Sequence, residues 1–473
     1  MKKNFHSLTA VIVFFILILA IFTRWIGYNN PHNYTFDEGL YAQLGLQLKE
    51  NSLNYTSQPV YEYCTSRGQS LPDYLNMPLF KHPPAYCYLI SLFYSILNPS
   101  YLSAFLVSLI FGIITIIVTY KIGVQFFNKN AALLASLFIA LDPIHWLCSE
   151  KIWMSTTLTA FIWMALFFLM RAIIDNNYRH FIWAGLATGA AILTKYPGFI
   201  IFPIAFTYVF LYNRKLFKSK YFWLWPAISL LMFSPWMVWN YNIYKSQFFT
   251  QMITAQGELK GNFYQIFAII GLAILLILAI VIFLKLYKKR IRYSPVHFSL
   301  SKKAVTILIS LGLIAFFSRP YMIRGLINVF NIRYIPLAGW KMAMFKQEPW
   351  DFYIRRLIEL SPFYLISIFG IFFLNKTKSK VLPLFVAIFW IMLVFILHGN
   401  FQCRYILPAV PAFLIISAYT ITWIFKKTSQ FYNKNQIVYI IFSLILVAIL
   451  AYSFTKTIII DLQLALPNNV CYF

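Results

Sequence analysis

Charged residues are scarce in this sequence, and acidic residues are scarcer still. Only 11% of the 473 residues are charged, and 13 Asp and Glu stand against 40 Lys and Arg. Soluble domains carry about 25% charged residues, so the composition excludes an ordinary soluble enzyme. The chain is 60% apolar and 20% aromatic, which predicts a polytopic membrane protein. We attribute the net charge of +27 to cytoplasmic loops, anionic lipid and phosphate-bearing substrates, and expect no nucleic-acid partner.

Two kinds of motif are also missing. The five cysteines show no CxxC spacing, which argues against a thiolate zinc site. The sequence has no glycine-rich phosphate loop, so no nucleotide is expected as a substrate. Two alternatives stay open for Cys64 and Cys87, which are either joined in a disulfide or unpaired.

Apolar runs near the length of a membrane span occur along the whole chain. A transmembrane helix needs about 20 residues, and about thirteen spans fit if residues 83–97 lie at the membrane interface. They are predicted at 8–26, 101–120, 131–147, 153–171, 181–195, 197–212, 221–241, 263–285, 303–319, 361–374, 380–398, 405–425 and 436–455. The first run is longer than a signal-peptide core and lacks a cleavage site, so we interpret it as a span. We predict a single all-α membrane domain over residues 1–473.

The distribution of charge predicts an orientation. With the N-terminus inside, every predicted cytoplasmic turn contains Lys or Arg, as the positive-inside rule requires. All acidic residues except Asp175 lie outside or at the outer ends of spans. This asymmetry predicts that the polar chemistry takes place on the extracytoplasmic face. The short loops favour a bacterial inner (plasma) membrane over the endoplasmic reticulum.

Three longer segments, about 27–100, 242–262 and 320–360, are predicted to be extracytoplasmic loops. In the first, Leu40, Leu44 and Leu48 recur at helical spacing within residues 36–48, an amphipathic pattern suited to the membrane surface. The aromatic segment 84–97 is too short to cross, which indicates a second interfacial helix.

Asp37 and Glu38 begin that amphipathic segment and are the first candidates for chemistry. Adjacent carboxylates at a helix start can cap the first turn and favour the helix dipole. Alternatively, one of them faces a cavity near the bilayer surface and acts as general base on an acceptor hydroxyl. Because neighbours on a helix point in different directions, only one is expected in such a site.

Four cations at the outer ends of predicted spans could bind a lipid-linked phosphate. Lys81 and His82 precede two prolines that fix the backbone before the interfacial helix, although a Lys-His pair in a loop is usually solvated. Lys195 ends one span, and Arg404, followed by Tyr405, begins another. The guanidinium fork suits a phosphate, although an arginine at an interface commonly extends toward lipid headgroups.

Metal binding is left open by the sequence. His145, Glu150 and His398, together with Asp37 and Glu38, could supply ligands for a divalent metal. Their spacing does not indicate that they converge, and scattered histidines are more often structural.

The order of these features resembles the GT-C superfamily of polyprenyl-phosphate-sugar-dependent glycosyltransferases, in particular protein O-mannosyltransferases and lipid A aminoarabinose transferases. The resemblance covers roughly residues 8–425, through Asp37-Glu38, the Lys-His-Pro-Pro step at 81–84, the small-residue run from Gly185 to Lys195, and Arg-Tyr-Ile-Leu-Pro at 404–408. It implies a GT-C fold, with juxtamembrane helices in the first extracytoplasmic loop and Asp37 as the catalytic carboxylate. Relatives often carry another acidic residue at the outer start of the fourth span, and here Glu150 lies slightly earlier.

The leading hypothesis is an inverting membrane glycosyltransferase that moves a sugar from a polyprenyl-phosphate donor to an extracytoplasmic lipid, glycan or protein acceptor, with Asp37 as general base. The residues expected to stabilise the departing phosphate are Lys81, His82, Lys195 and Arg404, and the accessory candidates are Glu38, Glu150 and Tyr405. A transporter or lipid flippase is the rival, and it would place ionisable residues midway along spans. A third alternative is an inactive scaffold whose Asp37 points away from the cations.

Overall fold

A computed structural model describes residues 2–29, 35–71, 73–79, 81–175, 177–245, 352–373, 378–398, 402–432 and 436–465. Within these ranges the chain is helical, apart from loops and an isolated bridge between Thr56 and Pro78, so the all-α prediction is confirmed. The chain divides into two compact units, residues 1–238 with 324–473 and residues 239–323. Only residues 239–245 of the second unit are described, and the single membrane domain stays a prediction.

The described helices largely follow the apolar runs. They are α1 (Lys2–Asn29), α2 (Phe36–Glu50), α3 (Gln58–Thr65), α4 (Ala85–Leu97), α5 (Tyr101–Phe126), α6 (Lys129–Ala140), α7 (Pro143–Glu150), α8 (Met154–Asp175), α9 (Tyr178–Thr194), α10 (Ile201–Tyr212), α11 (Lys220–Tyr244), α16 (Phe352–Leu360), α17 (Pro362–Phe373), α18 (Lys378–His398), α19 (Val410–Tyr432) and α20 (Gln436–Ala465). Short 3-10 turns lie at η1 (Asp73–Leu75), η2 (Tyr196–Ile200), η3 (Arg214–Lys218) and η7 (Cys403–Ala409).

Several of these helices can cross a membrane. In the described part of the chain, six are long and apolar enough, or up to seven if the bent pair α6–α7 counts as one span. The first, Leu8–Ile26, has the predicted bounds. These helices confirm an integral membrane protein. The predicted spans 263–285 and 303–319 lie outside the described residues, so the number thirteen stays a prediction.

The predicted span 131–147 is not one straight helix, because α6 and α7 meet at an angle of 55°. The Asp142 side chain caps α7 by accepting a hydrogen bond from the backbone N–H of His145 at 2.9 Å. Pro143 follows at the first helical position, where its missing N–H costs nothing. These two start signals interrupt the apolar run and begin a new helix direction.

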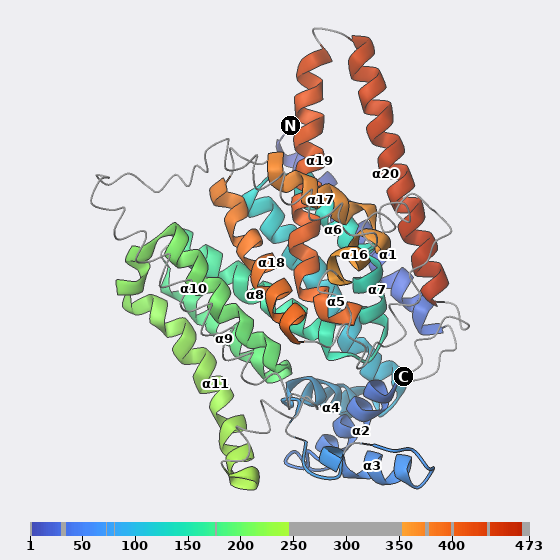
Figure 1. The fold of residues 1–473 in the computed structure, drawn as a ribbon, viewed down its shortest axis with the longest axis vertical. Coiled ribbons are helices and arrows are strands. Elements are labelled where there is room, and N and C mark those ends of the chain that lie inside the picture. Colours follow the sequence, from blue (N-terminus) through green and yellow to red (C-terminus); the bar gives the residue numbers. More distant parts are fainter. Residues whose placement is uncertain are drawn as a thin grey trace. The chain divides into compact units, whose positions relative to one another are not determined.

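The first long loop builds a layer of helices at one end of the bundle, where α2, α3 and α4 lie together (Figure 1). Leu40, Leu44 and Leu48 of α2 are buried, and α2 packs against α4. Gly45 permits this approach, because a Cβ there would overlap Ile90 of α4. The predicted amphipathic helix is therefore present, and α4 covers it.

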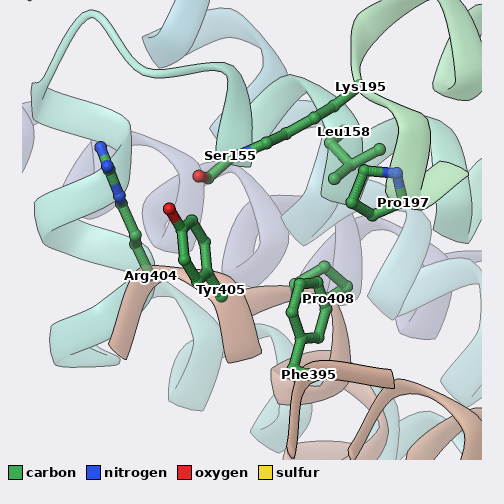
Figure 2. Close-up of a pocket in the computed structure, with 8 residues that line it drawn as sticks. All are labelled: Ser155, Leu158, Lys195, Pro197, Phe395, Arg404, Tyr405 and Pro408. Atoms are coloured by element: carbon green, nitrogen blue, oxygen red, sulfur yellow. The ribbon is translucent and has the colours of Figure 1, made fainter. Parts of the chain in front are cut away.

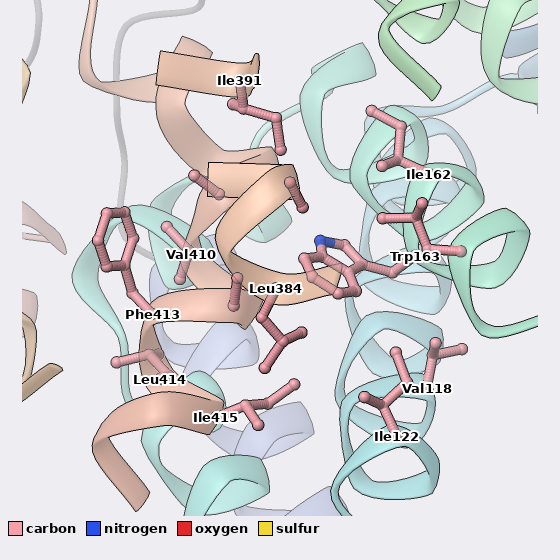
Figure 3. Close-up of a cluster of buried hydrophobic side chains, with 14 of the residues drawn as sticks. Val118, Ile122, Ile162, Trp163, Leu384, Ile391, Val410, Phe413, Leu414 and Ile415 are labelled. Atoms are coloured by element: carbon pink, nitrogen blue, oxygen red, sulfur yellow. The ribbon is translucent and has the colours of Figure 1, made fainter. Parts of the chain in front are cut away.

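The main apolar core holds the turn η7 in place. Trp163 of α8 is 1% exposed and points toward Leu384 of α18 and Val410 of α19 (Figure 3). Its indole N–H donates to the carbonyl oxygen of Pro408 in η7 at 2.8 Å. This bond ties η7, which precedes α19, to α8.

Two glycines of α9, Gly185 and Gly189, lie against another helix. A Cβ added at Gly185 would lie 2.8 Å from Cβ of Ile228, and one at Gly189 would lie 2.7 Å from the sulfur of Met232. Both partners belong to α11, so the glycines allow α9 and α11 to approach closely.

Candidate active site

A small pocket lies where α8, η2, α18 and η7 meet. Its empty volume is about 220 Å³, and its lining residues are Ser155, Leu158, Lys195, Pro197, Phe395, Arg404, Tyr405 and Pro408. Figure 2 shows Ser155, Lys195 and Tyr405 directed toward one another.

The polar lining residues sit at helix ends. Ser155 is in the first turn of α8, Lys195 directly follows α9, and Arg404 lies in η7 before α19. Prolines within η2 and η7 accompany these short turns, where the regular helical hydrogen bonding is interrupted. The sequence thus places its pocket cations at the ends of helices.

Arg404 is the most heavily contacted of the predicted residues. Its Nη1 lies 2.7 Å from Oδ2 of Asp37, and its Nε donates to Oε1 of Gln402 at 2.6 Å. The guanidinium carbon lies 4.7 Å from the ring centroid of Trp153 and 5.4 Å from that of Tyr405. The Arg404 and Asp37 side chains are 10% and 20% exposed, so the ion pair is mostly but not completely enclosed.

Tyr405 stands between two cations. The Lys195 Nζ lies 4.7 Å from the same tyrosine ring that Arg404 contacts. A cation over an aromatic face is attracted by the ring quadrupole, so one ring helps to hold two positive charges near each other. Phe395 stacks on Tyr405 at a centroid distance of 5.9 Å and fixes its plane.

Burial, and after it the positive charge of neighbouring groups, lowers the pKa of both Lys195 and His82. Lys195 follows the last residue of α9 and lies outside that helix. Its burial is the largest cause, and the positive charge of Arg404 the next, that lowers its pKa to about 7. Burial, followed by the charges of Lys195, Lys81 and Arg404, holds the pKa of His82 well below its usual value. His82 is therefore neutral at pH 7 and differs from the cation that the sequence suggested.

The two adjacent carboxylates of α2 have separate roles. Asp37 pairs with Arg404, whereas Glu38 closes a capping box with Thr35: it accepts from the Thr35 N–H at 2.9 Å, and the Thr35 hydroxyl accepts from the Glu38 N–H. Glu38 also accepts from the Tyr101 hydroxyl at 3.0 Å and from the Ile152 N–H at 3.3 Å. The capping interpretation is confirmed for Glu38, whereas the general-base role stays a prediction for Asp37.

Glu150 is the last residue of α7. It is 3% exposed and accepts from the indole N–H of Trp146 at 3.0 Å. His145 contacts Arg24, with 2.9 Å between its Nδ1 and the arginine Nη2. Among the described residues, no group of three or more His, Cys, Asp or Glu side chains could hold a metal ion.

The cysteines of the first loop are not joined. Cys64 and Cys87 are free thiols, and the Cys87 sulfur lies 3.7 Å from the hydroxyl oxygen of Tyr55. The unpaired alternative is the one present in the structure.

Three contributors to the site were missed by sequence reasoning. Trp153 under Arg404 and Ser155 in the pocket both follow Glu150 closely, and Gln402 stands two positions before Arg404. Proximity to the predicted residues was the available signal for all three. Their residue types, however, did not predict that Trp153 and Gln402 contact the Arg404 guanidinium or that Ser155 lines the pocket.

Comparisons with known proteins give one partial family match and several similar folds. A family model described as dolichyl-phosphate-mannose-protein mannosyltransferase matches residues 81–239. ArnT from Cupriavidus metallidurans bound to undecaprenyl phosphate has a TM-score of 0.52 at 13% identity, covering 98% of this chain and 76% of that one. No curated protein sequence matches the chain.

Two archaeal structures are also similar. The apo oligosaccharyltransferase from Archaeoglobus fulgidus has a TM-score of 0.58 at 17% identity, covering 97% of this chain and 56% of that one. AglB from the same organism, in complex with an inhibitory peptide and a dolichol-phosphate, has a TM-score of 0.55 at 16% identity, covering 98% of this chain and 56% of that one. This chain spans little more than half the length of the archaeal proteins, and the likeness is one of fold.

Proposed function

We propose that this protein, which belongs to the GT-C superfamily, is a glycosyltransferase that uses a polyprenyl-phosphate-linked sugar and an extracytoplasmic acceptor. The observation that carries the proposal is the meeting of Asp37 with Arg404 at the edge of a pocket that also contains Lys195. A carboxylate beside two cations supplies both a base and a place for the leaving phosphate.

The donor phosphate would bind at Lys195 and Arg404. These two cations are next to one carboxylate, which leaves positive charge for an anionic headgroup. Lys81 adds to this charge, since it acts on the pKa of both Lys195 and His82. Two similar folds were solved with a polyprenyl or dolichol phosphate, which supports a lipid phosphate as the ligand.

His82 would contribute as a neutral hydrogen-bonding group. Its Nδ1 is buried and has no hydrogen-bond partner among the described residues, while Tyr41 contacts its ring edge-on at 5.9 Å. A neutral imidazole can donate one hydrogen bond to a phosphate oxygen or sugar hydroxyl without adding charge.

Asp37 would act as the general base. It would accept the proton of the acceptor hydroxyl while the acceptor oxygen attacks the anomeric carbon. The bond from that carbon to the phosphate oxygen breaks with its electron pair on the phosphate, and the anomeric centre inverts. Arg404 and Lys195 would stabilise the charge that develops on the leaving group.

The position of the charges argues against the rival functions. A transporter would place its ionisable residues midway along spans, whereas Lys195 and Arg404 lie in turns at helix ends. An inactive scaffold would have no reason to direct Asp37 toward Arg404, yet the two side chains form an ion pair.

We further propose a bacterial inner membrane with the active site outside, and a lipid, glycan or protein acceptor.

The test is release of polyprenyl phosphate from a panel of lipid-linked monosaccharides by the purified protein, with membrane extract as the acceptor source. Wild type is compared with Asp37→Asn, which removes the base while keeping the side-chain shape. Asp73→Asn, an exposed change in the same loop, is the matched control. We expect wild type and the control to release polyprenyl phosphate and Asp37→Asn to release none above background.

Full turnover by Asp37→Asn would remove Asp37 as the base. Binding of the lipid-linked sugars by the wild type with no release from any donor, in any extract, would instead favour a transporter or scaffold.

A further inference from the structure

Asp37, which we propose as the base, and Arg404, which we propose as a phosphate ligand, form an ion pair with each other. Asp37 Oδ2 lies 2.7 Å from Arg404 Nη1. While this contact lasts, the carboxylate oxygen is not free to receive an acceptor hydroxyl, and the guanidinium nitrogen is not free to donate to a phosphate. The site as it stands is therefore assembled but blocked.

We propose that the Asp37–Arg404 ion pair is a latch that the donor phosphate opens, so that donor binding precedes and permits proton removal from the acceptor. The inference rests on the proposed function, and it adds an order of binding to it. A phosphate oxygen would replace the Asp37 carboxylate on Arg404, and the released carboxylate would turn to the acceptor hydroxyl.

Arg404 is built to stay in place when Asp37 leaves. Its Nε remains bonded to Gln402, and the flat guanidinium keeps contact with the rings of Trp153 and Tyr405. It also lines the pocket, so an anion there reaches it directly. Arginine binds phosphate and carboxylate with the same fork of donors, which makes one a direct competitor of the other.

Asp37 can leave without moving its helix. The start of α2 is fixed by the Thr35–Glu38 capping box and by the bonds that Glu38 accepts from Tyr101 and Ile152. Release of the carboxylate therefore needs only a change of rotamer by a side chain that is already 20% exposed.

The latch differs from a simple loss of nearby negative charge in one respect, because its gain in phosphate affinity requires Arg404. Removing the catalytic carboxylate should strengthen binding of the lipid phosphate, because Arg404 no longer has to give up a partner. The effect should depend on Arg404, because that side chain is the one released.

The experiment measures equilibrium binding of undecaprenyl phosphate to the full-length protein in nanodiscs of neutral lipid. The proteins are wild type, Asp37→Asn, Arg404→Gln, the double variant, and Asp73→Asn as a control of equal charge change. We expect Asp37→Asn to bind about tenfold more tightly, equal to about 1.4 kcal/mol. The double variant should bind as weakly as Arg404→Gln alone. Neutral polyprenol should show no gain, and Asp37→Ala supplies a second removal of the charge should the amide variant misfold.

The outcomes separate the two proposals. Unchanged or weaker binding in Asp37→Asn, with binding still dependent on Arg404, overturns the latch and leaves the phosphate site standing. Binding that is indifferent to Arg404→Gln overturns the phosphate site, and the latch with it. An equal gain in Asp73→Asn would show a general effect of net charge and would also overturn the latch.

Discussion

Two arginine centres in the described part of the chain use similar residues in different ways. Arg404 faces a carboxylate, an amide and two aromatic rings at the edge of a pocket. Arg24 of α1 is 1% exposed; its Nη1 donates to the Thr23 hydroxyl at 2.8 Å and its Nη2 contacts His145. The Arg24 guanidinium also lies over the ring of Trp146, as the Arg404 guanidinium lies over that of Trp153.

The Arg24 centre continues through the bend between α6 and α7. Arg24 also donates to the carbonyl of Ala140, the last residue of α6. Asp142, 2% exposed, accepts from the His145 N–H and from the Tyr364 hydroxyl of α17. The centre therefore joins α1, the bend and α17.

The difference between the centres lies in access and in the balance of charge. At Arg404, a second cation, Lys195, lines the same pocket, so positive charge is available to attract a further anion. The ion pair with Asp37 is partly exposed, so such an anion can reach it. At Arg24, the contacts are buried and lead from one helix to another. Residue types alone do not separate a reactive site from a structural one.

The largest expected effect comes from Arg404→Lys, which keeps the charge and loses the fork. We expect release of polyprenyl phosphate to fall about 100- to 1,000-fold, as when one transition-state donor is lost, with little change in unfolding temperature. Arg171→Lys on the exposed end of α8 is the control. Wild-type turnover in Arg404→Lys would place Arg404 with Arg24 as a structural residue.

Arg24→Met should show the opposite pattern. It leaves the partners of a buried guanidinium unsatisfied, so we expect a loss of about 3 kcal/mol in stability, measured by thermal unfolding in detergent. Affinity for polyprenyl phosphate per folded molecule should stay near wild type. Arg171→Met, which breaks an exposed pair with Asp175, should cost no more than about 0.5 kcal/mol. A selective loss of affinity in Arg24→Met would contradict the division between the centres.

Glu38→Ala should fall between these cases. It removes the capping box and the acceptor for Tyr101 and Ile152, which should cost about 2 kcal/mol of stability. Because Asp37 is next to it, turnover should fall more than affinity for polyprenyl phosphate. Glu38→Gln keeps an acceptor and should recover most of both. Equal loss of turnover and affinity would show that Glu38 supports the whole pocket.

The smallest expected effect is a pH dependence of donor binding. With a pKa of about 7, Lys195 is charged below pH 7 and loses its charge as the pH rises through that value. Bound phosphate would hold the proton, so affinity for polyprenyl phosphate should weaken about tenfold between pH 6 and pH 8. Lys195→Arg stays charged, and its binding should lack this component. Identical profiles for the two proteins would exclude Lys195 as the titrating group.

Much of the fold followed from composition and hydropathy, but the bend in α6–α7 did not. Asp142-Pro143 is a recognisable helix start, yet it stands inside an apolar run long enough to suggest one continuous span. Hydropathy averages over a window and gives two polar start signals little weight. The residues that cap helices carry information that a span prediction discards.

The site was predicted in its parts rather than in its assembly. Asp37, Lys195 and Arg404 stood out as charges near the outer ends of apolar runs. The contact between Asp37 and Arg404 joins opposite ends of the chain and depends on tertiary packing. The lowered pKa of His82 likewise comes first from burial and then from the charges of Lys195, Lys81 and Arg404, and the burial depends on tertiary packing that the sequence alone did not reveal.

The pocket walls come from α8, η2, α18 and η7, while the carboxylate comes from α2 in the first-loop layer. Trp163 binds η7 to α8, so the walls are fastened to one another without help from α2. Sequence change in α2 and α3 can therefore alter the surroundings of Asp37 while the packing around Lys195 and Arg404 is kept. In evolutionary terms, the proposed enzyme can change its acceptor while keeping the two pocket cations that we assign to its donor.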